Sequence, residues 1–301
     1  MSDETYSQIM RILELPILFV ATIFSAIRCR MLGRHAIGVV YESENGTLIS
    51  GTADMFVGGN LGFRGHYEKG ALNSLLRLVE HESRVLVLGP HVGAFAIPIA
   101  KKVREVVAYE ANPETFRLLQ YNLKLNNVDN FTAFNLAAGD RAGKIEFMTS
   151  GVNSGASGRQ FGSSPGLTLE RFARIEVEMV RLVDHLADPR FDLVLMDIEG
   201  SEYFALLGMA PVLGTCSYLQ FEYLPAVLRR NGVTDENLAA VLGDHFSELR
   251  VQGTELFAER KDFLKLLRQL RHENRHVDLL AVAARASAHA KHRTSPLAPA
   301  G

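Results

Sequence analysis

Acidic residues follow apolar, strand-like runs at two places in the chain. Asp197 comes directly after the apolar residues LVLM, and Glu199 stands two positions later. Glu222 lies near the end of the run SYLQFEY. Carboxylates at strand ends can act as general bases, and two or three together can hold Mg²⁺ or Ca²⁺. Asp197, Glu199 and Glu222 are therefore candidate catalytic residues, with a divalent cation as an alternative use and no metal ligand assigned.

A second group of residues suits the binding of a nucleoside. In VLVLGPHVGAFAIPIA, Gly89 and Gly93 stand where a buried strand ends and a helix begins. Glycines there allow a tight turn and bring backbone N–H groups close to a ligand. Glu110 ends the next strand-like run, EVVAYE, and a carboxylate at that place can accept hydrogen bonds from both hydroxyls of a ribose.

These residues require a sheet that gathers the strand ends at one edge. Apolar runs alternate with helical patterns over residues 67–285: RVLVLG, EVVAYE, FTAFNLAAG, FDLVLMD, SYLQFEY and HVDLLAVAA. Strands that are apolar on both faces and separated by helices predict an α/β fold with a doubly wound, mostly parallel sheet covered on both sides.

The alternation is interrupted between Asp140 and Val183. The runs KIEFM and IEVEMVRLV alternate in the manner of antiparallel strands, and they flank a stretch rich in Gly and Ser. We expect a flexible loop over residues 151–167, either a lid over the site or a disordered segment.

Three segments lie outside the main pattern. Residues 1–34 contain the apolar run LPILFVATIFSAI over 15–27, which is too short to span a bilayer. We interpret it as a helix that packs on the core or a second copy, or that contacts a membrane surface. Residues 35–66 are expected to form a β-hairpin lead-in, with Asn45 and Gly46 supplying positive φ angles, and residues 286–301 a disordered tail.

Composition restricts the partners. The net charge of −2 gives no overall field to hold nucleic acid, so we expect a small-molecule or glycan acceptor and no nucleic acid. The two cysteines, Cys29 and Cys216, form no motif and suit a reducing compartment. The expected location is the cytoplasm, with the inner face of the membrane as an alternative for the apolar segment. The histidines of RHENRH, His272 and His276, are interpreted as part of a solvated face.

Together these segments resemble the FkbM family of S-adenosylmethionine-dependent methyltransferases. The resemblance covers residues 67–285 and is carried by VLVLGPHVGAFAIPIA, VVAYEANPETFRLLQYNLKLNN, NLAAGDRAGKIEF and above all LVLMDIEGSEYFALLG. It implies a Rossmann-like, class I methyltransferase fold with seven strands, and transfer of a methyl group to a hydroxyl of a glycan, a lipid-linked molecule or a secondary metabolite.

The resemblance also implies roles for individual residues. Asp197 would lie nearest the transferred methyl group, with Glu199 or Glu222 as base or orienting group. S-adenosylmethionine, converted to S-adenosylhomocysteine, would be held by ten residues: Gly89, Pro90, His91, Gly93, Glu110, Asn112, Ala138, Gly139, Asp140 and Asp197.

The chain departs from the family pattern at three positions. Val87 stands where the family has an acid that helps to fix the cofactor's ammonium group, His91 replaces an Asn, and Leu195 replaces a Lys. A non-catalytic scaffold of the same fold is therefore an alternative. An NAD-dependent oxidoreductase is another, although the glycine spacing does not match G-x-G-x-x-G and the acids around Asp197 would have no role.

Overall fold

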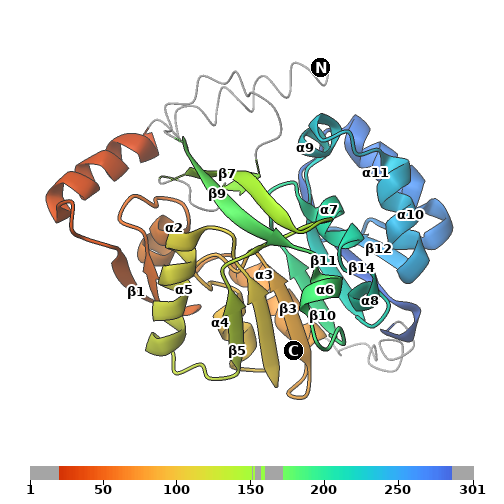
Figure 1. Cartoon of the computed structure of the whole chain (residues 1–301), viewed down its shortest axis with the longest axis horizontal. Helices are drawn as coiled ribbons and strands as arrows, with labels where there is room; N and C mark the ends of the chain where they lie inside the picture. The colour runs from red at the N-terminus through yellow and green to blue at the C-terminus, as the bar shows by residue number, and fades with distance from the viewer. Residues whose placement is uncertain (1–19, 151, 153–156, 160–171, 287–301) are drawn as a thin grey trace, which may run out of the picture.

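The computed structural model describes residues 20–150, 152, 157–159 and 172–286 of the 301-residue chain. Its centre is an eight-stranded sheet in the order β13-β12-β14-β11-β10-β3-β4-β5 (Figure 1). The bounds are β3 Arg84–Leu88, β4 Glu105–Tyr109, β5 Phe131–Phe134, β10 Leu193–Met196, β11 Tyr218–Tyr223, β12 Glu248–Val251, β13 Phe257–Glu259 and β14 Val277–Val282.

The sheet is the expected Rossmann-like one. The five neighbouring strands β11, β10, β3, β4 and β5 pair in parallel, and β14, β12 and β13 are antiparallel to their neighbours. The expected number of seven strands is exceeded because β13 adds an edge strand of three residues. A run that short carries no recognisable alternation.

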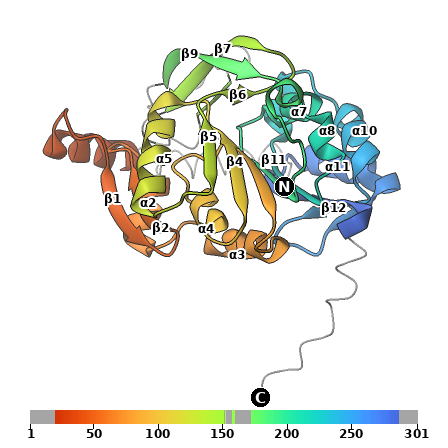
Figure 2. The same ribbon diagram turned by 60° about the horizontal axis from the view of Figure 1, so that its bottom comes forward.

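Helices cover both faces of this sheet because its central strands are apolar on both sides. Val85 and Val87 of β3 pack into one cluster, and Leu86 and Leu88 pack into another. The first cluster includes α3 (Lys69–Leu78) and α4 (Ala96–Ala100), and the second includes α7 (Glu202–Leu207), α8 (Ala210–Leu213), α10 (Asp235–His245) and α11 (Phe263–His272). Figure 2 shows α3 and α4 on the side of the sheet away from α7 and α8.

A smaller sheet lies across the carboxyl end of the larger one. It has the order β6-β9-β7-β8, with β6 Ala137–Ala138, β7 Gly143–Ser150, β8 Gly158–Arg159 and β9 Phe172–Val180. The predicted antiparallel pairing of the KIEFM and IEVEMVRLV runs is confirmed, since β7 and β9 pair along their whole length (Figure 1). The loop expected over residues 151–167 lies mostly outside the described residues, and within it Gly158 and Arg159 pair with β7.

The predicted hairpin is present as β1 (Val39–Ser43) and β2 (Gly46–Ser50). Of the two turn residues only Gly46 has a positive φ, so the expectation for Asn45 is wrong. Asn45 is buried instead, and its side-chain amide donates to the carbonyl oxygens of Tyr67 and Ala94. The same segment contains a helix that the pattern did not predict, α2 (Val57–Arg64).

A helix over residues 20–32 precedes the hairpin and packs on it through polar contacts (Figure 1). Ser25 is buried and donates to the Ala53 carbonyl oxygen at 2.8 Å. Arg28 donates to the carbonyl oxygens of Thr52 and Asp54 and to the Tyr41 hydroxyl. Apolar side chains on the remaining surface of the helix are exposed: Val20, Ile23, Phe24, Ile27, Met31 and Leu32. Within the described residues, no helix combines the length and apolar character needed to cross a bilayer.

The residues before 20 and after 286 fall outside the described part of the chain. The expected disordered tail over residues 286–301 therefore lies there, apart from Ala286.

Candidate active site

A pocket of about 660 Å³ opens where the parallel strands end, a volume in the usual range for a small-molecule site. Its walls come from the ends of β3, β4, β10 and β11, the start of α3, and the small sheet. A doubly wound sheet places ligands at this edge. The position follows from the topology that the sequence predicts.

The first turn of the pocket is folded tightly against β10. Gly89 has a φ of 79°, and a Cβ there would lie 1.9 Å from the Asp197 carbonyl oxygen. The Asp197 backbone N–H donates to the Leu88 carbonyl oxygen at 3.0 Å. Any side chain at Gly89 would therefore force the ends of β3 and β10 apart.

Three residues of the pocket wall that are not glycine have left-handed backbone conformations. They are Glu68 (φ 42°), His91 (φ 53°) and Glu199 (φ 52°). Such angles cost free energy for a residue with a Cβ, and they occur more often at functional sites.

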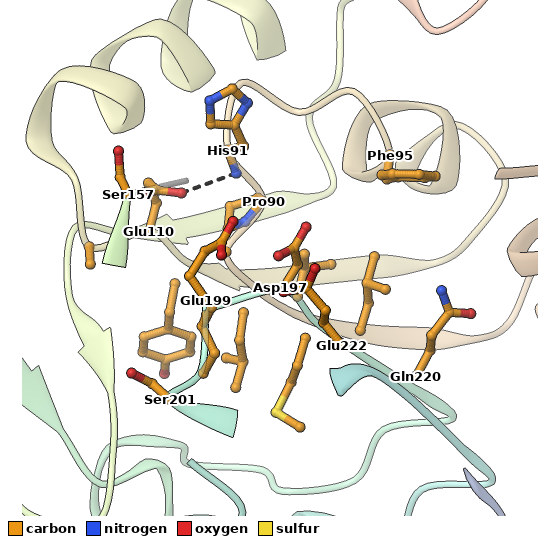
Figure 3. A pocket seen from close by; sticks show the side chains of 18 of the residues that line it. Pro90, His91, Phe95, Glu110, Ser157, Asp197, Glu199, Ser201, Gln220 and Glu222 are labelled. Carbon is orange, nitrogen blue, oxygen red and sulfur yellow. Dashed lines mark hydrogen bonds between the residues drawn. The ribbon is translucent and has the colours of Figure 1, made fainter. Parts of the chain in front are cut away.

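Glu110 is held inside the pocket by the backbone around it. Its Oε2 accepts from the His91 N–H at 3.0 Å and its Oε1 from the Asn112 N–H at 2.8 Å. Figure 3 shows the first of these bonds and the His91 ring, which points away from the other carboxylates. Burial raises the pKa of Glu110 to about 7 against the opposing effect of these two bonds. A carboxylate has about four lone-pair sites, so acceptor capacity remains for a ligand.

The three acids expected to do chemistry lie together in the pocket. Asp197, Glu199 and Glu222 each offer a carboxylate oxygen, and these atoms lie within 4.8 Å of one another (Figure 3). Burial, followed by the charge of Glu222, raises the pKa of Asp197 and brings that of Glu199 to about 8. Carboxylates this close do not all ionise near neutral pH, so the cluster retains a proton. The spacing also suits a hard cation such as Mg²⁺.

Two neighbours of the cluster differ in their exposure to the pocket. Glu202 is buried and its Oε1 accepts from the Ile198 N–H at 3.1 Å, which fixes the turn after β10. His276 lines the pocket and forms a hydrogen bond with Glu222 Oε1. The interpretation of His276 as part of a solvated face is therefore incomplete, since the ring is exposed but belongs to the site.

No sequence pattern indicated a site role for His276, because its place in the pocket depends on strand pairing. β14 runs antiparallel to β11, and Glu222 is opposite Asp278 in the register. Residues 54 positions apart thus meet at the pocket. Tyr67, Glu68 and Asp278 line the pocket in the same way, and only tertiary structure brings them there.

Four residues expected to bind the cofactor are not among those that line the pocket. Asn112 is the N-cap of α5 (Pro113–Leu125), where its side chain accepts from the Glu114 N–H. Gly93 shapes the turn from behind, because a Cβ there would meet Ile97 and Leu119. Gly139 packs against Met179, and Asp140 forms an ion pair with Arg141 at 3.5 Å. Capping uses the Asn112 side chain and packing surrounds Gly93 and Gly139, whereas Asp140 Oδ1 is buried with no hydrogen-bond partner among the described residues. Their expected contacts with a cofactor stay predictions.

The remaining expected residues do line the pocket: Gly89, Pro90, His91, Glu110, Ala138, Asp197, Glu199 and Glu222. The small sheet adds an apolar wall formed by Ala138, Ile145, Phe147 and Met179. It also approaches the acids closely, since a Cβ on Gly158 would lie 2.9 Å from the Glu199 Cβ.

Residues 89–223 match the family described as methyltransferase FkbM domain. Over this range, which is less than half of its length, the chain resembles FkbM methyltransferases. The matched range begins at the glycine turn and ends one residue after Glu222, so it contains Glu110, Asp197, Glu199 and Glu222. His276 lies beyond it.

The chain covers less than two thirds of the length of each of the similar proteins that follow. The methyltransferase FkbM from Methylobacillus flagellatus KT is 16% identical with a TM-score of 0.41, covering 67% of this chain and 44% of that one. Trm5b from Pyrococcus abyssi is 12% identical with a TM-score of 0.42, covering 83% and 56%.

Two curated relatives are tRNA (guanine(37)-N(1))-methyltransferases. The one from Danio rerio is 44% identical over 55 residues, and the one from Homo sapiens is 52% identical over 50 residues. These matches cover 18% and 16% of this chain but only 12% and 10% of the relatives' own lengths.

These relatives contradict the expectation that nucleic acid is not a partner. That expectation rested on the net charge of −2, whereas curated proteins with local similarity to this chain are methyltransferases named for tRNA. Net charge sums over the whole surface and does not describe the local surface that meets a ligand. It therefore gives no reason to exclude this class of acceptor.

Proposed function

We propose that this methyltransferase uses S-adenosylmethionine and transfers the methyl group to a hydroxyl oxygen of its acceptor. The observation that carries the proposal is the cluster of Asp197, Glu199 and Glu222 in the same pocket as Glu110. Glu110 suits a ribose, and the cluster suits removal of a proton. A hydroxyl acceptor is the case in which a base is needed, because the proton must leave as the new bond forms.

The residues of the pocket fit the cofactor. Glu110 would offer a buried carboxylate to the two ribose hydroxyls, and the tight turn at Gly89 holds the ends of β3 and β10 together beside it. The apolar wall formed by Ala138, Ile145, Phe147 and Met179 offers a surface for a flat adenine ring. When bound, S-adenosylmethionine supplies an electrophilic methyl group on a sulfonium.

The fit differs from the family pattern at Val87. This side chain lines the pocket and is almost fully buried, so it cannot bind an ammonium group. Glu68, at the start of α3, and Asp197 line the same pocket and supply carboxylates near that strand. We propose that these acids replace the missing one.

The acids have distinct tasks in the transfer. Asp197, whose backbone touches the glycine turn, lies nearest the reacting centre in this proposal, and Glu199 or Glu222 accepts the hydroxyl proton. Holding the acceptor oxygen in line with the carbon–sulfur bond supplies much of the rate enhancement expected of such a site. The raised pKa of Glu199, about 8, makes it a stronger base than an ordinary carboxylate once it has lost its proton.

A second candidate is methyl transfer to a ring nitrogen of a nucleobase. The two curated tRNA methyltransferases favour it, since they share up to 52% identity with this chain over a short segment. A carboxylate can also accept a proton from a ring N–H, so the cluster does not distinguish the two acceptors by its chemistry.

The test begins with cofactor binding. Calorimetric titration with S-adenosylhomocysteine should show binding, with NAD as the control ligand. Heat from NAD alone would favour the oxidoreductase, and no heat from either would favour the non-catalytic scaffold.

The second step separates the acceptors. The protein is incubated with radiolabelled S-adenosylmethionine and either hydroxylated small molecules and glycans or unmodified tRNA, with and without EDTA. We expect label in the hydroxylated acceptors. Label in tRNA alone would replace the first candidate with the second, and loss of transfer in EDTA would assign a cation to the acids.

A further inference from the structure

The hydrogen bond between His276 and Glu222 extends the carboxylate cluster. His276 immediately precedes β14, and its Nε2 bonds to Glu222 Oε1. Glu222 Oε2 is buried and has no hydrogen-bond partner among the described residues. Glu222 thus has one oxygen fixed by the imidazole and a second one available to a ligand or to the neighbouring acids.

The two hydrogen-bonded side chains, Glu222 and His276, differ in their exposure to solvent. The Glu222 side chain is 16% exposed, whereas that of His276 is 63% exposed. Glu222 also offers an oxygen within 4.8 Å of oxygens of Asp197 and Glu199. These side chains therefore connect the carboxylate cluster to the exposed imidazole, with no gap larger than one water molecule can bridge.

The charges around His276 come from three elements. Glu222 lies on β11, Glu199 on the turn after β10, and Asp278 on β14 itself. The hydrogen bond with Glu222 is the main reason that the pKa of His276 is raised, and burial opposes it. In the other direction, the charge of His276 lowers the pKa of Glu199. The two groups therefore influence each other's protonation.

We propose that His276 is a positioning residue that fixes Glu222 in the pocket and passes the acceptor's proton from the carboxylates to solvent. The inference rests on the proposed function. It assigns to the site a residue outside the range matched by the FkbM domain.

The proton balance of the step is complete. The acceptor oxygen forms a bond to the methyl carbon, and the carbon–sulfur bond breaks with its electron pair left on sulfur. The hydroxyl proton goes to a carboxylate of the cluster, then through Glu222 to the neutral His276 ring, and from the ring to water. No oxidant or further reactant is needed.

The test compares the pH profiles of methyl transfer by the wild type and His276→Gln. Below the pKa of His276 the wild-type ring carries a positive charge near Glu199 that the variant lacks, so the acidic limb of the profile should move up by about one pH unit. Loss of the proton path should lower the maximal rate about 10-fold to 100-fold, and added imidazole should restore part of it.

Two further variants separate charge from proton transfer. His276→Lys keeps a positive charge but no neutral ring, so we expect the limb to stay in place while the rate remains low. His272→Gln, on an exposed histidine at the end of α11, is the matched control and should match the wild type.

The outcomes distinguish the two hypotheses. A lower rate in His276→Gln, with no shift of the acidic limb of the pH profile and no rescue by imidazole, would show a purely structural role. That result would overturn the inference about His276 and leave the proposed function standing. Binding of S-adenosylhomocysteine by the wild type without transfer to any acceptor would overturn the proposed function as well. NMR titration of the His276 ring gives a readout without activity: its pKa should fall in Glu222→Gln, and an unchanged value would overturn the coupling.

Discussion

At the scale of single residues, Glu110 shows how burial and hydrogen bonding compete at one carboxylate. Two backbone N–H groups favour its charged form, and burial disfavours it, with a resulting pKa of about 7. The neutral form would keep the turn intact but would be a poorer acceptor for ribose hydroxyls. We therefore expect protonation of this one buried group to control the proposed binding of the nucleoside.

Replacement of Glu110 by alanine should weaken binding of S-adenosylhomocysteine by about 1–3 kcal/mol, the usual value of hydrogen bonds to a charged group. In the wild type, affinity should rise as the pH increases through about 7, because the carboxylate then loses its proton. Calorimetry at several pH values checks both statements. Equal affinity in the variant and the wild type would remove the ribose assignment.

At the scale of elements, the small sheet determines access to the acids. β8 lies so close to the turn after β10 that only glycine fits at position 158. Ser157 lines the pocket beside Gly158. Its side chain ends in an uncharged hydroxyl, so the edge of the small sheet adds little charge to the pocket wall. Among the described residues, this sheet lines the pocket beside the acids without adding a carboxylate of its own.

Gly158→Val should lower the rate of methyl transfer at least 10-fold while leaving the affinity for S-adenosylhomocysteine within about 1 kcal/mol, since displacing Glu199 by ~1 Å is costly for catalysis. Glu110 and the glycine turn lie on other strands and are not displaced. Gly70→Ala is the matched control, because nothing lies within 4 Å of a Cβ there. A variant with normal turnover would show that β8 can move aside freely.

The same elements show how far the sequence could predict the site. Glu110 and Asp197 follow buried parallel strands, and such strands share one edge, so their meeting at the pocket could be expected. Asn112 could not be excluded from the sequence, because an N-cap and a ligand contact use the same side chain. The approach of Gly158 to Glu199 depends on the pairing of β8, and a strand of two residues is too short to leave a periodic pattern in the sequence.

At the scale of the whole molecule, polar contacts hold the N-terminal helix to the hairpin and to the turn that follows it. Arg28 supplies three of them, to Thr52, Asp54 and Tyr41, and Ser25 supplies another. The apolar side chains on the rest of the helix are exposed and contribute little burial. The polar contacts therefore account for much of the helix's attachment.

Arg28→Ala should free this helix at a cost of about 1–3 kcal/mol in local stability, because the carbonyl oxygens it serves lose a charged donor. Hydrogen exchange of residues 20–32 should become faster, with little change in the central sheet. Arg30→Ala, on an exposed neighbour, is the control. Exchange that speeds up equally throughout the chain would show that the helix is part of the global folding unit.

The left-handed backbone at Glu68, His91 and Glu199 has a consequence for the directed evolution of this protein. Glycine relieves such conformations, so a library screened only for heat resistance should accumulate glycine at these three positions. Each of those changes would also remove a side chain from the pocket wall. Selection for robustness and selection for turnover are therefore expected to diverge first at these sites, and a screen that applies both would retain the strained residues.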